Sequence, residues 1–212
     1  MGNYYQPLLP DETYHLFSRA VGSEKLFLSS ENYLFFLRKL KQHTAPICRF
    51  YCYSLLPNHF HLLVKINNEE RLIQHFEEVK KKAYKTLDNN ISDFVMERFS
   101  NCLNSYTKAY NKLYKRKGAL FMDYLKRSAV KEEKDFTAFV WYIHKNAVHH
   151  QLTQTIGRWP HDSYLSILSD APTVLLRDEL IKWFGGKTAF IEFHQQKILP
   201  KNAMPNSYFQ DL

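Results

Sequence analysis

The stretch YCYSLLPNHFHLLVKI, residues 51–66, decides the fold of this chain of 212 residues. It forms the larger part of two apolar segments, Ile47 to Leu56 and His59 to Ile66, which are separated by the turn dipeptide Pro57-Asn58. Both segments are rich in aromatic and aliphatic residues, as β-strands are. Two strands this close in sequence pair as an antiparallel hairpin, so the sequence predicts a β-hairpin here.

Two histidines, His59 and His61, stand two positions apart on the second strand of this hairpin. Because strand side chains alternate between faces, both imidazoles project from one face, while Phe60 and Leu62 point into a core. Two neighbouring imidazoles on a rigid strand are half of a divalent-metal site. Half-buried, hydrogen-bonded histidines give the same spacing, so the pair alone leaves both interpretations open.

Further elements follow from the apolar periodicity on both sides of the hairpin. In chain order we expect a strand at 13–21, a helix from Ser29 or Ser30 to 42, the hairpin, helices at 69–87 and 93–114, a strand at 120–130 and a helix from Asp135 onward. The order β-α-β-β-α-β-α predicts an α+β, ferredoxin-like fold, with an antiparallel sheet and helices on one face. Residues 1–170 would form this domain. Residues 171–212, with short helices near 175–184 and 188–196, would form a small helical C-terminal extension.

The composition limits the class of protein. A hydrophobic content of 45% and an aromatic content of 16% predict a folded chain. No apolar run approaches the length of a membrane span, and no secretory signal stands at the N-terminus, so no membrane partner is expected. Three cysteines do not make a disulfide framework. We therefore expect a cytoplasmic protein.

The net charge of +8 and the isoelectric point of about 9.2 suit a polyanionic partner, with nucleic acid first. Basic residues gather in clusters that are interleaved with tyrosines, as in proteins that bind single strands. A solvated helix face above a packed tyrosine stripe would give the same pattern, and composition does not separate the two. The candidate DNA-binding residues are Lys80, Lys81, Lys82, Lys112, Lys115, Arg116, Lys117, Lys126 and Arg127.

Tyr142 and Asn146 lie four positions apart on the helix that begins at Asp135, so they share a face. We expect that face to differ from the one that carries Phe139 and Ile143. A tyrosine hydroxyl is an unusual nucleophile because its ordinary pKa is near 10. Spacing alone favours a structural tyrosine at the sheet surface.

These two motifs together resemble those of a known family. The segments Tyr53–Leu63 (YSLLPNHFHLL) and Tyr142–Val148 (YIHKNAV) are similar to the HUH single-strand transposases of the insertion-sequence class, most of all to the REP-associated tyrosine transposases. The resemblance spans roughly residues 14 to 164. The family usually has proline after the asparagine, whereas this chain has Ala147, which allows the helix to continue through His149 and His150.

The resemblance implies a site and an activity. His59, His61 and Asn146 would bind a divalent metal, Mg²⁺ or Mn²⁺, and Tyr142 would be the catalytic nucleophile. The enzyme would be a DNA strand transferase that nicks and rejoins single-stranded hairpin DNA through a covalent 5′-phosphotyrosine, as in DNA transposition. The sequence does not decide between a monomer and a homodimer that exchanges its tyrosine helix.

Two other readings remain open. The chain could be a domesticated, non-catalytic protein that binds DNA hairpins, or a zinc-stabilised RNA-binding domain. For the latter, Cys48 and Cys52 on one strand face could join the two histidines, although the spacing matches no structural zinc motif. The ladder of Tyr106, Tyr110 and Tyr114 offers competing nucleophiles, and its spacing is more typical of core packing or base stacking.

Overall fold

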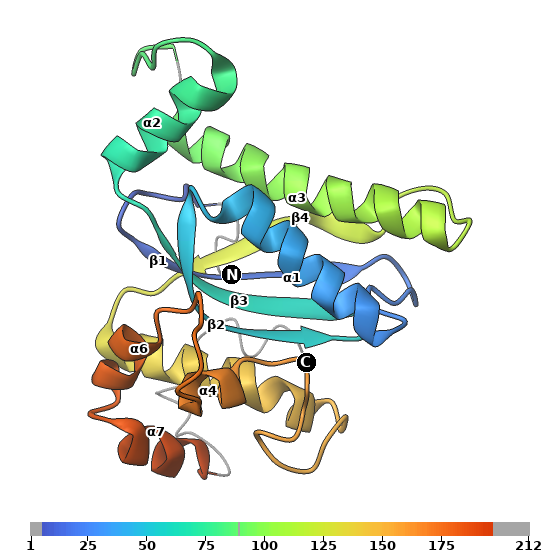
Figure 1. Ribbon diagram of the computed structural model, residues 1–212, viewed down its shortest axis with the longest axis vertical. Helices are drawn as coiled ribbons and strands as arrows, with labels where there is room; N and C mark the ends of the chain where they lie inside the picture. The colour runs from blue at the N-terminus through green and yellow to red at the C-terminus, as the bar shows by residue number, and fades with distance from the viewer. Residues whose placement is uncertain (1–5, 89, 197–212) are drawn as a thin grey trace.

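The computed structural model describes residues 6–88 and 90–196 (Figure 1). At its centre lies a sheet of four strands: β1 (Thr13–Ala20), β2 (Cys48–Leu56), β3 (His59–Ile66) and β4 (Phe121–Ala129). Their spatial order is β2-β3-β1-β4, and every neighbouring pair is antiparallel. The α+β class and the ferredoxin-like antiparallel sheet are therefore confirmed.

The β2–β3 hairpin has the register that the sequence predicts, with Leu56 paired to His59 across the turn. Backbone hydrogen bonds hold the turn from outside. The carbonyl oxygen of Pro57 accepts from the amide of Leu26 at 2.7 Å, and the carbonyl oxygen of Asn58 accepts from the amide of Ala20 at 2.7 Å. The first residue of β3, His59, is thus fixed by β1 as well as by β2.

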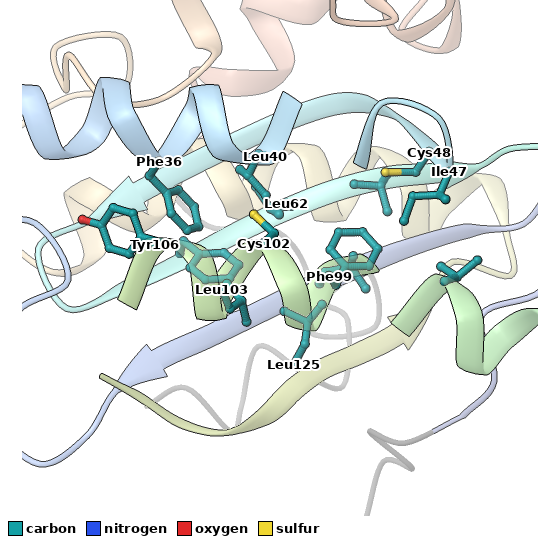
Figure 2. Packing of buried hydrophobic residues seen from close by; sticks show 14 of the residues in the cluster. Phe36, Leu40, Ile47, Cys48, Leu62, Phe99, Cys102, Leu103, Tyr106 and Leu125 are labelled. Atoms are coloured by element: carbon teal, nitrogen blue, oxygen red, sulfur yellow. The ribbon is translucent and has the colours of Figure 1, made fainter. Parts of the chain in front are cut away.

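One face of the sheet packs against α1 (Ser30–Thr44) and α3 (Ile91–Leu113). Figure 2 shows the aromatic and aliphatic side chains that fill the space between these two helices and the strands. The short helix α2 (Glu69–Lys80) lies on the same side and buries Leu72 and Phe76 in this cluster. Helix α2 ends seven residues before the expected Leu87, because Lys81 adopts a left-handed conformation with φ of 56°.

The opposite face of the sheet is covered by α4 (Glu133–His149), so the expectation of helices on one face is corrected (Figure 1). The reason lies in β2 and β3, which are apolar on both faces. Leu62 and Val64 join the α1/α3 cluster, whereas Leu63 and Cys52 join a second cluster with α4. A sheet with two apolar faces needs cover on both.

The chain beyond α4 forms three short helices, α5 (Tyr164–Leu168), α6 (Arg177–Trp183) and α7 (Lys187–His194). Their residues Ile167, Leu180 and Phe190 are fully buried and belong to the same cluster as α4. Both α5 and the two helices of the expected extension, α6 and α7, therefore pack on α4 and share its core. No helix among the described residues is long and apolar enough to cross a membrane.

Candidate functional site

Three residues of the sequence motifs meet between β3 and α4. His59 and His61 project from the face of β3 that α4 covers, and Asn146 reaches both of them. His59 Nε2 lies 3.1 Å from Asn146 Oδ1, while Asn146 Nδ2 donates to His61 Nε2 at 3.2 Å. A single side-chain amide thus bridges the two imidazoles that the sequence paired, although 85 residues separate Asn146 from His61.

His59 has an amide oxygen at each ring nitrogen. Nδ1 lies 2.8 Å from Asn58 Oδ1, and Nε2 faces Asn146 Oδ1. Burial lowers the pKa of His59 to about 4, with smaller contributions from His150 and Arg19, so at neutral pH the ring carries one proton. With that proton on Nδ1, a nitrogen lone pair and an amide oxygen face each other across the site. A cation placed between them would satisfy both.

His61 is held by a residue that the sequence motifs did not include. His15, on β1, places Nε2 at 2.9 Å from His61 Nδ1. Because Asn146 donates to His61 Nε2, the proton of His61 sits on Nδ1 and is donated to His15. The Nδ1 of His15 has no hydrogen-bond partner among the described residues, although the ring is fully buried. An unpaired buried N–H costs about 1–3 kcal/mol, so this arrangement lowers the stability of the folded protein.

The environment keeps all three imidazoles neutral. Burial lowers the pKa of His15 to about 3 and that of His61 well below its ordinary value. Only neutral imidazole has the lone pair that a metal requires. Across residues 6–88 and 90–196, no three His, Cys, Asp or Glu side chains lie close enough together to hold a metal ion. The amide of Asn146 is therefore the side-chain donor that stands beside the two imidazoles, and this donor set fits a divalent cation.

Tyr142 lies one helical turn before Asn146 and packs directly on the histidines. Its ring centroid is 5.3 Å from that of His61 and 5.8 Å from that of His15. The side chain is only 2% exposed. Phe139 also contacts His15, at 4.9 Å between ring centroids, so Tyr142 and Phe139 share the sheet-facing side of α4. The expectation that they occupy different faces is corrected, because residues three positions apart on a helix are neighbours on its surface.

Two cationic residues border the site on the same face of the sheet. Arg19 on β1 is paired directly with His59 in the β-ladder, and side chains opposite each other in a ladder share a face. The ammonium of Lys126 lies 5.9 Å from the ring of Phe17, which stacks on His61 at 5.8 Å. Lys126 was nominated from sequence, whereas Arg19 was missed. The sequence shows on which face of β1 the side chain of Arg19 lies. It does not show that β1 pairs with β3.

The other nominated basic residues lie away from these histidines. Lys80, Lys81 and Lys82 stand at the end of α2, on the side of the sheet opposite α4 (Figure 1). Lys80 forms an ion pair with Glu97 at 2.6 Å, and the ammonium of Lys82 lies 5.7 Å from the ring of Phe76.

The remaining predicted residues lie in the last turn of α3, in the loop after it, or on β4. Arg116 pairs with Glu24 at 2.9 Å and donates to backbone carbonyls, so it holds the loop together. Arg127 is buried and donates to the carbonyl oxygen of Gln6. The side chains of Lys112, Lys115 and Lys117 are exposed.

The competing tyrosines of α3 are structural. The hydroxyls of Tyr106 and Tyr110 donate to the carbonyl oxygens of Leu26 and Lys25 at 2.5 and 2.7 Å, and Tyr114 donates to Asn32 at 2.9 Å. Tyr106 and Tyr110 lie on α3 and Tyr114 directly follows it, across the sheet from His61. Of the two expected roles, core packing and base stacking, the burial of Tyr106 and Tyr110 fits core packing, whereas Tyr114 is 36% exposed.

The positions of Cys48 and Cys52 exclude the alternative zinc site. Cys48 belongs to the α1/α3 cluster and Cys52 to the α4 cluster, so the two thiols lie on opposite faces of β2. A register shift between Phe50 and Cys52, a β-bulge, breaks the alternation that placed them together. The expectation of one shared face is therefore corrected.

Comparison with known proteins places the fold. No protein-family model matches the chain, and no curated protein matches it by sequence. Among solved structures, the chain is similar to a REP-associated tyrosine transposase bound to a REP hairpin, with a TM-score of 0.59 and 14% sequence identity. The similarity covers 82% of this chain and 93% of that chain. At this identity the comparison shows a shared fold.

Proposed function

We propose that this protein is a DNA strand transferase that nicks and rejoins single-stranded hairpin DNA, in the manner of a tyrosine transposase. The observation that carries the proposal is the contact between Asn146, His59 and His61 beside Tyr142. The family resemblance implies these four side chains as one site, and the contacts of Asn146 with both histidines beside the ring of Tyr142 support it. The structural neighbour is a transposase bound to a hairpin, which supports the same class of substrate.

In the proposed reaction the phenolic oxygen of Tyr142 attacks a phosphorus of the single strand. The bond from phosphorus to Tyr142 forms as the bond to the 3′ oxygen breaks, so the 5′ phosphate stays on the protein. The proton lost by the phenol balances the one gained by the 3′-OH. A second 3′-OH then displaces the tyrosine and restores a phosphodiester, so no nucleotide cofactor is consumed.

His59, His61 and Asn146 would hold the divalent cation. When bound, Mg²⁺ or Mn²⁺ would polarise the scissile phosphate and stabilise the leaving oxygen. Imidazole is a softer ligand than those Mg²⁺ prefers, which favours Mn²⁺. Arg19, opposite His59 in the ladder, is placed to bind a phosphate oxygen at the exposed side of the site.

Tyr142 is almost fully covered, so its hydroxyl reaches a phosphate only after a side-chain or helix movement. We expect DNA binding to provide the free energy for that movement. Adduct formation should therefore be slower than DNA association.

A labelled hairpin with a single-stranded flank tests the proposal. With Mg²⁺ or Mn²⁺ the purified protein should nick this DNA but leave a duplex of the same sequence intact, and EDTA should stop nicking. Undiminished nicking in EDTA would remove the metal from the mechanism. Absence of any nicking or adduct on a panel of hairpins would favour the non-catalytic hairpin-binding protein.

A further inference from the structure

A groove runs along the exposed edge of the sheet, away from the site of Tyr142. Strand β2 is the outermost strand, and later segments of the chain cover only parts of its edge. The amide of Leu176 donates to the carbonyl oxygen of Phe50 at 2.8 Å, and the amide of Ser163 donates to that of Tyr53 at 3.0 Å. Between these two points of cover, a cavity of about 530 Å³ opens between α1 and residues 172–175.

The walls of this groove are apolar and remain partly open to solvent. Leu34 on α1 is 55% exposed and Val174 on the opposite wall is 65% exposed. The aromatic rings of Phe50 and Tyr53 also line the groove, and both residues are half-buried. Partly exposed aromatic rings in an open groove are suitable surfaces for stacking nucleobases.

The charged residues that line the groove are all cationic. Arg38 and Lys41 lie one turn apart on α1, and Arg49 comes from β2. No Asp or Glu lines it, and none of the three cations forms an ion pair with a described residue. In contrast, Lys80, Arg98, Arg116, Lys134, Arg177 and Lys187 each have a carboxylate partner. The guanidinium of Arg38 lies 5.7 Å from the centre of the Phe35 ring, a contact that leaves its charge without a carboxylate partner. Cations without carboxylate partners beside a groove that holds two aromatic residues are complementary to a chain of phosphates that carries bases.

We propose that this β2-edge groove, lined by Arg38, Lys41 and Arg49 with Phe50 and Tyr53, is a second binding site for single-stranded nucleic acid. Phosphates would lie against the three cations and one or two bases would stack on the rings. The site lies at the sheet edge, separate from Tyr142 and the two histidines. It would hold a flanking strand while the reactive phosphate lies elsewhere. That role rests on the proposed strand transfer, but the binding itself does not.

The test measures binding of a fluorescent oligo(dT) 12-mer by anisotropy. All variants are made in a Tyr142→Phe chain, so that binding is read without cleavage. Arg38→Glu and Lys41→Glu should each weaken binding on the order of tenfold. The slope of log K against log salt should become shallower by roughly 1 for each phosphate contact removed. The matched control is Lys39→Glu, which makes the same charge change on the same helix outside the groove lining and should have little effect.

Equal losses from Lys39→Glu and Arg38→Glu would reduce the effect to net charge and overturn the site. So would unchanged binding in both groove variants. Cross-linking with a bromodeoxyuridine 12-mer should label Phe50 or Tyr53, whereas labels confined to the loop after α3 would place the strand there. Equal competition by polyglutamate would show that the groove recognises charge alone, or an acidic peptide, and would also overturn the proposal.

These results are separable from the proposed strand transfer. If no hairpin forms an adduct with Tyr142, the anisotropy result for the groove still stands. If the groove variants bind oligo(dT) normally, the adduct assay with the unmodified chain is unaffected.

Discussion

His15 and His61 share a hydrogen bond of 2.9 Å between β1 and β3, and this contact fixes which nitrogen of His61 faces the site. When His61 donates from Nδ1, its Nε2 lone pair points toward Asn146. A hydrogen bond on the remote nitrogen of a ligating histidine orients the ring and raises its basicity. His15 therefore acts on the candidate metal through His61.

Removing the His15 imidazole should weaken Mn²⁺ binding by about 10–100-fold, the usual effect of losing such a support. His15→Ala tests this by titration calorimetry with Mn²⁺, and His15→Asn, which keeps a hydrogen-bonding amide near the same position, should recover part of the affinity. His75→Ala on α2 is the control, because His75 lies on the opposite side of the sheet. Full Mn²⁺ affinity in folded His15→Ala would rule out this support.

Tyr142→Phe should abolish the covalent adduct and leave hairpin binding nearly intact. The change deletes one hydroxyl and keeps the ring that packs on His61. The assay is a denaturing gel with labelled hairpin, in which an adduct survives denaturant and disappears with protease. Tyr110→Phe is the matched control on α3. An adduct that persists in Tyr142→Phe and disappears in Tyr110→Phe would show that the nucleophile is Tyr110 and not Tyr142.

Salt dependence should separate the basic residues that follow α3. Lys115 and Lys117 are exposed, whereas Arg116 is engaged by Glu24 and two carbonyl oxygens. If the lysines contact phosphates, Lys115→Gln with Lys117→Gln should flatten the slope of log K against log salt by roughly 2. Arg116→Gln should instead lower the free energy of unfolding. An unchanged slope in the double variant would place this loop away from the DNA.

Asp162 should oppose the histidines in the pH dependence of stability. Burial raises the pKa of Asp162 to about 7 from 3.8, so it contributes stability below pH 4 that is lost as pH rises toward 7. His15 has a pKa lowered to about 3, so its contribution is present above pH 6.5 and lost as pH falls toward 3. The stability of Asp162→Asn relative to the unmodified chain should therefore increase from pH 5 to pH 8, as measured by urea unfolding. A constant difference would contradict the raised pKa.

His194 should stabilise α4 from the extension. His194 Nδ1 donates to the carbonyl oxygen of Phe190 at 2.7 Å, so its Nε2 accepts from His144 Nδ1 at 3.0 Å. His194→Leu leaves that buried donor unpaired and should lower the free energy of unfolding by about 1–3 kcal/mol. His194→Gln, whose amide oxygen can accept in its place, should lose less. A chain ending at Ser169 would lose Leu180 and Phe190 as well, and should unfold at a lower urea concentration.

Local patterns predicted the elements of this fold well. The bounds of β3 agree with the expected His59–Ile66, and α4 runs through His149 as the absence of proline at Ala147 allows. The proximity of His59, His61 and Asn146 was implied by the family resemblance, and their contacts are seen in the structure. Strand alternation and helix periodicity are properties of neighbouring residues, which is why they are readable along the chain.

What escaped prediction depends on contacts between distant segments. The support of His61 by His15 requires the pairing of β1 with β3, across 46 residues. Cys48 and Cys52 lie on opposite faces because of a β-bulge between Phe50 and Cys52. No glycine or proline marks this bulge in the sequence. The expectation of helices on one face was wrong, because the assignment of each helix to a face depends on packing between segments that are distant in the sequence.

The packing of α6 and α7 on α4 has a consequence for the order in which the chain is made. The helix that carries Tyr142 is synthesised before residues 177–194, which bury its outer side. On the ribosome, the apolar outer surface of α4 therefore stays exposed until the extension has been synthesised. A nascent chain would carry the tyrosine and both histidines while this helix is still loosely held, so the site should mature only when α7 has emerged. Pausing of synthesis between α4 and α7 would then expose an aggregation-prone surface.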